Sequence, residues 1–126
     1  AFRNTSFKDC KMIGLRFDLC NKFGLLLSFE SCILNLSSFY KLKLKNTSFI
    51  NSKLNEVDFS YCDLNSSIFT NCDLTRAAFD NTNLEKADLS TSFNYSINPE
   101  ANRINKAKFS FPGIVGLLDK YDIEIC

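Results

Sequence analysis

Large apolar residues recur along this chain with a period of five. The period runs through Phe2, Phe7, Met12 and Phe17, and it resumes at Phe29. A helix face repeats every 3.6 residues and a strand face every two, so neither element buries such a row on one side. A short fixed period therefore predicts a repeat architecture. The regular row consists of Phe29, Leu34, Phe39, Leu44, Phe49, Leu54, Phe59, Leu64, Phe69, Leu74, Phe79, Leu84 and Leu89, which we predict to be the structural core.

The remaining positions of each pentapeptide predict its local shape. The residue two before each large one is mostly small or apolar, and two residues in an extended segment that are separated by one share a side. The other three positions are mostly polar and rich in Asn, Asp and Ser. These residues tolerate tight turns and hydrogen-bond their own backbone. Each pentapeptide is thus predicted to be a short extended piece followed by a corner.

The period is interrupted once in the N-terminal part. Twelve residues separate Phe17 from Phe29, which is two repeats plus two extra residues. We interpret residues 18–28 as an irregular insertion. Because loops on rigid scaffolds often carry binding, Asn21, Lys22 and Phe23 are candidate partner contacts.

After Leu89 the pattern changes, and we divide the chain into repeats at 1–91 and a C-terminal cap at 92–126. Asn98-Pro99 predicts a turn. Ser110 and Pro112 precede residues at near-helical spacing, and Tyr121 to Ile125 alternate like a short strand. The apolar residues of this predicted helix are Phe111, Ile114, Val115, Leu118 and Tyr121. They would cover the exposed end coil, and the alternative is that they join two copies of the chain.

The repeats resemble a known family. The units CDLNS, CDLTR and ADLST resemble the A-(D/N)-L-X-X motif of pentapeptide repeat proteins, over about residues 1–17 and 27–91. The resemblance implies an all-β fold, a right-handed four-sided β-helix solenoid with twenty residues per coil. With four sides, residues twenty apart stack, so Phe29, Phe49 and Phe69 form one column. Phe39, Phe59 and Phe79 then form the opposite column, with Leu residues between them.

Composition and charge add two expectations. The 126 residues are 45% hydrophobic, which fits one globular domain. Neither a membrane-length apolar run nor a secretory signal is recognisable, so we expect a cytoplasmic protein with no membrane partner. The chain lacks an initiator Met, and we suspect a missing N-terminal piece. Residues 1–55 hold nine Lys or Arg against three Asp or Glu, and residues 56–90 hold two against seven.

The candidate chemical groups are mostly explained by the repeat. Cys10, Cys32, Cys62 and Cys72 occupy small inward positions, which favours buried free thiols, whereas Cys20 and Cys126 stay unassigned. The chain has no His, no Cys-X-X-Cys pair and no Gly-rich phosphate loop. We therefore predict neither an enzyme nor a metal or cofactor site.

Lysines form the most distinctive surface feature. Lys41, Lys43 and Lys45 alternate with Leu42 and Leu44, so the register directs all three lysines outward. Two interpretations stay open. The lysines could protect and solubilise the solenoid, or they could bind a phosphate or a protein partner.

The tail suggests a function through a second resemblance. Residues 94–125 resemble the C-terminal region of the microcin B17 immunity and quinolone-resistance (Qnr-type) branch of the family. This resemblance implies a dimeric mimic of duplex DNA that protects DNA gyrase or topoisomerase IV and does not bind nucleic acid directly. Here the acidic pattern is confined to residues 56–90. The alternative is a general protein-interaction scaffold with an unrelated partner.

Overall fold

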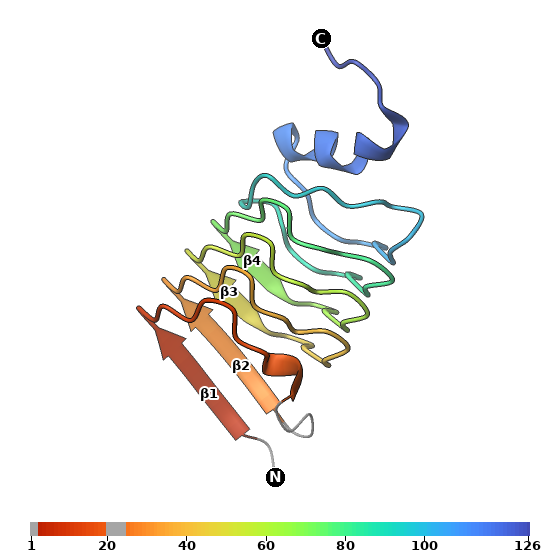
Figure 1. Ribbon diagram of the computed structural model, residues 1–126. Coiled ribbons are helices and arrows are strands. Elements are labelled where there is room, and N and C mark those ends of the chain that lie inside the picture. The colour runs from red at the N-terminus through yellow and green to blue at the C-terminus, as the bar shows by residue number, and fades with distance from the viewer. Residues whose placement is uncertain (1–2, 20–24) are drawn as a thin grey trace.

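The computed structural model describes residues 3–19 and 25–126, which wind into a rod of stacked coils. Strands β1 (Arg3–Lys8), β2 (Leu25–Glu30), β3 (Ser48–Ile50) and β4 (Ile68–Thr70) form a parallel sheet in the order β1-β2-β3-β4 along one side of the rod (Figure 1). Isolated parallel bridges join successive coils elsewhere, as between Ile33 and Lys53. The predicted β-helix solenoid is therefore confirmed.

Coil length follows directly from the pairing register. Phe29 pairs with Phe49, and Phe49 with Phe69, so each coil contains twenty residues. The first pairing differs, because Phe7 lies opposite Phe29, twenty-two residues away. The two extra residues predicted between Phe17 and Phe29 therefore lengthen the first coil only. A short 3-10 helix, η1 (Phe17–Leu19), begins this irregular part.

Phenylalanine rings fill the centre of the rod in two columns. Rings in Phe29, Phe49 and Phe69 stack with centroids 5.1 and 5.0 Å apart, and those in Phe39, Phe59 and Phe79 with centroids 5.4 and 5.3 Å apart. The columns meet edge to face, with the Phe39 and Phe49 centroids 5.9 Å apart. Both arrangements are favourable for aromatic rings. The stacked columns expected from the Phe and Leu alternation are confirmed, and all thirteen residues of the regular row are buried.

The corners adopt a left-handed backbone. From Ser31 to Lys86 every fifth residue has a φ between 50° and 65°, and each lies two residues after a large core residue. Asn tolerates this conformation, and it occupies the position at 46, 51, 71 and 81. Leu36 and Tyr61 also occupy it, although bulky side chains disfavour a positive φ.

Aspartates before the large residues stabilise these turns. A carboxylate oxygen of Asp58 accepts a hydrogen bond from the backbone N–H of Ser60 at 2.9 Å, and Asp88 accepts one from Ser90 at the same distance. The bonds from the Ser90 side chain and backbone lower the pKa of Asp88. The motif aspartates thus serve the fold, as the sequence pattern predicts.

Paired coils continue beyond residue 91. Asp73 pairs with Phe93, Asn83 with Arg103 and Asp88 with Lys108. Ile104 and Phe109 pack against the core, fifteen and twenty residues after Leu89. Asn94 and Pro99 fall on the five-residue period, but Tyr95 and Ile97 are the buried residues there. The stacked coils of the solenoid therefore extend to about residue 109.

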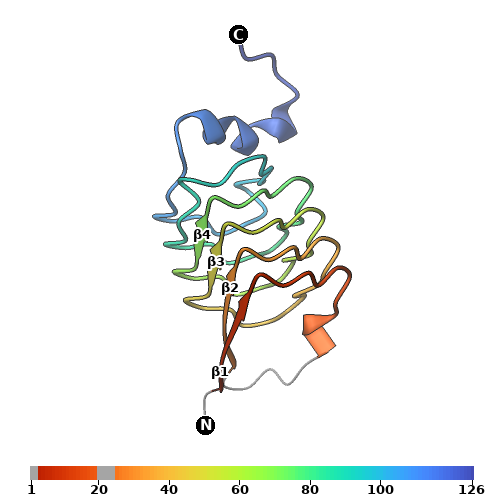
Figure 2. The same cartoon turned by 90° about the vertical axis from the view of Figure 1, so that its left-hand side faces the viewer.

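A cap of two 3-10 helices follows, η2 (Pro112–Leu117) and η3 (Asp119–Tyr121), and lies across the end of the coils (Figure 2). Instead of a longer helix, the chain forms short 3-10 turns. Ser110 does act near the helix start, because its Oγ accepts the Gly113 N–H at 2.9 Å. The expected strand from Tyr121 to Ile125 is wrong, since the chain beyond Tyr121 forms no strand. No described helix has the length and apolarity to cross a membrane.

Candidate interaction surfaces

The lysine cluster, Lys41, Lys43 and Lys45, lies on the outside of the second coil. All three lysines are exposed, whereas Leu42 and Leu44 are buried. Within the described residues, none of the three forms an ion pair. The cluster therefore presents uncompensated positive charge to solvent.

Two tyrosines adjoin this cluster. The rings of Tyr40 and Tyr61 meet edge to face with centroids 5.8 Å apart, and the Lys41 ammonium lies 5.2 Å from the centre of the Tyr40 ring. Tyr61 is 50% exposed. Aromatic side chains are enriched in protein interfaces, so lysines and tyrosines together form a candidate binding surface.

The other predicted contacts in this region, Asn21, Lys22 and Phe23, lie outside the described residues. The segment before them contains an ion pair between the exposed Arg16 and the buried Asp18. Arg16 binds both carboxylate oxygens of Asp18, with N–O distances of 2.9 and 2.7 Å. These hydrogen bonds hold the pKa of Asp18 below its usual value. The bidentate pair therefore joins Arg16 to the first turn of η1 by two charge-assisted hydrogen bonds.

Most of the predicted cap residues face solvent. Phe111 is 88% exposed, Val115 45% and Tyr121 49%. Ile114 is exposed as well, and Leu118 is half-buried. Leu117, which the helical spacing did not select, is the cap residue that packs against the core. The cap therefore covers the last coil with one side and leaves an apolar surface on the other.

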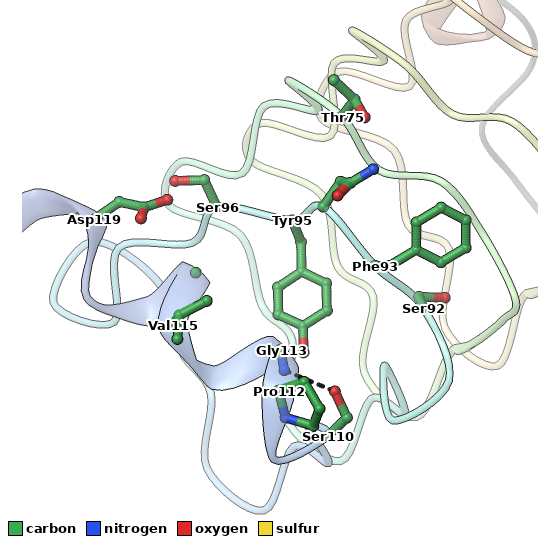
Figure 3. Close-up of a pocket in the computed structure, with 12 residues that line it drawn as sticks. Thr75, Ser92, Phe93, Tyr95, Ser96, Ser110, Pro112, Gly113, Val115 and Asp119 are labelled. Carbon is green, nitrogen blue, oxygen red and sulfur yellow. Dashed lines mark hydrogen bonds between the residues drawn. The ribbon is translucent and has the colours of Figure 1, made fainter. Parts of the chain in front are cut away.

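A cavity of about 610 Å³ lies between the last coil and η2 (Figure 3). Phe93 lines it from the coil and Val115 from the cap. Tyr95 extends beneath η2 with its hydroxyl toward Gly113, and this buried hydroxyl has no partner among the described residues. A Cβ on Gly113 would lie 1.9 Å from the hydroxyl, and one on Gly116 would lie 2.1 Å from the Tyr95 carbonyl oxygen. Both Gly113 and Gly116 must therefore lack a side chain for the cap to pack against Tyr95.

The described cysteines are free thiols. Cys32, Cys62 and Cys72 are buried, Cys10 is half-buried and Cys126 is exposed, while Cys20 lies outside the described residues. Burial raises the pKa of Cys62 to about 12 and that of Cys72 to about 11. Because the thiolate is the reactive form, these two residues are poor nucleophiles at neutral pH. In the described part of the chain, no three His, Cys, Asp or Glu residues are grouped as metal ligands.

Residues 27–96 match the sequence profile of the family described as pentapeptide repeat region, which covers more than half of the chain. The chain belongs to the pentapeptide repeat proteins. The twenty-residue coils and buried Phe columns are the structural counterpart of this match. No curated protein matches the chain.

Solved pentapeptide repeat proteins resemble this one in fold. One from the thylakoid lumen of Arabidopsis thaliana is 25% identical, with a TM-score of 0.56 over 78% of this chain, which spans 60% of that protein. One from the cyanobacterium Nostoc, involved in heterocyst differentiation regulation, is 14% identical, with a TM-score of 0.44 over 79% of this chain and 55% of that one. The plasmid-mediated fluoroquinolone resistance protein QnrB1 is 12% identical, with a TM-score of 0.31 over 94% of this chain and 100% of that one.

Sequence reasoning missed several residues of this pentapeptide repeat protein. Ile104 and Phe109 continue the five-residue period after Leu89, so extending the count through residues 90–103 would have found them. Tyr40 and Tyr61 gave no such signal, because their contact joins two coils. The packing of Tyr95 under the cap likewise depends on tertiary structure.

Proposed function

We propose that this protein is a non-enzymatic, cytoplasmic binding protein of the Qnr-type branch that engages DNA gyrase or topoisomerase IV and protects it from toxins or quinolones. The single observation that carries the proposal is a rigid rod whose middle coils hold half of the acids and few basic residues. Residues 56–90 contain seven Asp or Glu and two Lys or Arg. The right-handed, four-sided coil would present these acids at fixed spacing to a DNA-binding surface. The resemblance of residues 94–125 to the same branch supports the assignment.

Three acids do not accept the N–H of their own turn and are suited to partner contact. Asp80 is exposed, whereas Glu56 and Glu85 form surface ion pairs with Arg76 and Arg103 at 3.4 and 2.9 Å. Such surface pairs contribute little to stability, about 0–1 kcal/mol. Glu56 and Glu85 can therefore release Arg76 and Arg103 and bind basic groups of another protein instead.

A gyrase supercoiling assay with a quinolone tests this function. We expect added protein to restore supercoiling in a dose-dependent manner. The triple variant Glu56→Gln, Asp80→Asn, Glu85→Gln should lose protection while remaining folded. Lys53→Gln, an exposed change in the basic half, serves as control. Failure of the wild-type protein to bind gyrase or to restore supercoiling would exclude this function.

A general scaffold with an unrelated partner is the second candidate. It is favoured by the local role of Asp58, Asp63, Asp73 and Asp88, whose carboxylates accept hydrogen bonds from their own turns. Acids used for folding need no charged partner. A pull-down that lacks topoisomerase subunits but retains another protein at fixed stoichiometry would favour this candidate.

We further propose that two copies form a homodimer through the cap. The cap residues at this end of the rod are the exposed Phe111, Ile114, Val115 and Tyr121 together with the half-buried Leu118. Apolar surface of this kind commonly marks an interface. Sedimentation velocity should give a dimer for the wild type and a monomer for Phe111→Ser with Val115→Ser. A dimer that persists in this double variant would contradict the cap interface.

A further inference from the structure

Residues 122–126, here called the acidic tail, are exposed and form neither helix nor strand. Asp122 and Glu124 alternate with Ile123 and Ile125, each of which is 56% exposed. Neither acid forms an ion pair within the described residues. Beyond η3 the chain runs away from the coils (Figure 1). The carboxylates of Asp122 and Glu124 are thus available to a partner.

The lysine cluster is complementary in charge to these acids. Lys43 lies on one side of the coil, and Lys41 and Lys45 lie in the turns that flank it, so the cluster presents positive charge along that side and at both corners. Asp63 pairs with Lys43 in the neighbouring coil, but its carboxylate accepts bonds from the Asn65 N–H and the Asn83 amide. The cluster therefore retains its positive charge for an external partner.

Tyr61 is a second, independent indication of binding at this surface. Its φ is 59°, a conformation unfavourable for a bulky residue, and its ring remains half-exposed. Asn81, the next residue of the same corner column, shows that the fold accepts Asn there. The Tyr61 ring packs on Tyr40 beside the lysines and still leaves half of its surface for a partner.

We propose that the acidic tail of one copy binds the lysine cluster of a second copy. Asp122 and Glu124 lie opposite the lysines, and Ile123 packs against the exposed Tyr61. The contact is heterologous, because tail and cluster are different surfaces of the same chain. It goes beyond the proposed function, uses none of the cap residues Phe111 or Val115, and adds a salt-sensitive association to any cap dimer.

Sedimentation velocity of the full chain at low and high salt tests the contact. To isolate it, every protein carries Phe111→Ser with Val115→Ser. We expect association at 50 mM salt to weaken strongly at 500 mM, because exposed charges are screened. Lys43→Glu should weaken it by more than about tenfold, which corresponds to 1.4 kcal/mol. Lys53→Glu, the same charge change at an exposed lysine of another side, should leave it unchanged.

A mixing experiment identifies the two surfaces. Lys43→Glu retains an intact tail and Glu124→Lys retains an intact cluster, so neither should self-associate while an equimolar mixture forms a heterodimer. Tyr61→Asn should raise the melting temperature and weaken association. A mixture that stays monomeric, association that does not respond to salt, or equal effects of Lys43→Glu and Lys53→Glu would each overturn the proposal. Gyrase protection by a chain lacking this contact would leave the proposed function intact.

Discussion

Individual side chains join each coil to the next through buried hydroxyl and thiol groups. The Ser67 Oγ donates to the Leu44 carbonyl oxygen at 2.7 Å and accepts the Thr47 N–H at 3.2 Å. Cys62 donates in the same way to the Phe39 carbonyl oxygen, at 2.9 Å. The Leu44 and Phe39 carbonyl oxygens already accept the N–H of Thr47 and Leu42 within their own turns, so each side chain adds a second hydrogen bond that comes from the next coil. Ser67 and Cys62, at the small inward position of their repeats, are therefore hydrogen-bond donors as well as small side chains.

These buried thiols predict a specific alkaline instability. The pKa values of Cys62 and Cys72 are raised to about 12 and 11, above the value near 9 in the unfolded chain. The folded protein thus holds protons that the unfolded chain releases, so this stabilisation is complete below pH 9 and is lost as the pH rises toward 12. Urea unfolding at pH 7 and pH 10.5 should show a larger drop for the wild type than for Cys62→Ser with Cys72→Ser. Equal drops would contradict protonated thiols in the core.

At the scale of elements, the pentapeptide is the structural unit, and no unit is stable alone. Each provides one large side chain and one left-handed corner. Its backbone forms hydrogen bonds within the corner and with the coils on either side. Stacking places identical side chains in columns, which close-packs a narrow interior. Stability of such a solenoid depends mainly on contacts between neighbouring coils.

Truncating one ring of a column should be severely destabilising. Phe49 stacks on Phe29 and Phe69 with centroids 5.1 and 5.0 Å apart. Phe49→Ala removes both contacts and leaves a cavity, so we expect a loss of about 3–5 kcal/mol in the free energy of unfolding, measured by urea titration. Ile68→Ala, an outward residue of the same side that is 43% exposed, should cost much less. A loss below about 1 kcal/mol for Phe49→Ala would rule out its burial in solution.

At the scale of the whole molecule, the two ends of the rod differ in charge, and the cap covers the last coil. Basic residues are concentrated in the first coils and acidic residues in the middle coils. The cap is attached by a few specific contacts. Gly116 accepts the Ile97 N–H at 3.0 Å, and Lys120 pairs with Glu100 at 2.8 Å. A single substitution at one of these contacts can therefore detach the cap from the coils.

Gly116→Ala should displace the cap and leave the coils folded. The new Cβ would lie 2.1 Å from the Tyr95 carbonyl oxygen, which is backbone and cannot easily move away. We expect faster trypsin cleavage after Lys120, with the β-sheet circular dichroism signal retained. Ser96→Ala, a change in the same cavity, should cleave at the wild-type rate. Equal protection in both variants would show that the glycine is not needed for docking.

The sequence alone determined the repeat architecture. A five-residue period fits neither a helix face nor a strand face, so its large residues can be buried together only inside a stacked solenoid. The sequence also predicted the extra residues near Phe17, since these depend on counting along the chain. The two Phe columns followed from the Phe and Leu alternation once the family resemblance implied four sides per coil. The turn role of the aspartates was predictable as well, because each bonds within its own repeat.

Only the tertiary structure decided the features that join residues from different coils. The Tyr40 and Tyr61 contact, the seat of the cap on Tyr95 and the outward direction of Phe111 depend on which segments meet in space. The near-helical spacing after Ser110 predicted a longer helix, but two glycines and the close approach to Tyr95 favour short 3-10 turns. Local periodicity fixes a repeat because every coil has the same environment, whereas the ends of the rod have an environment that occurs once.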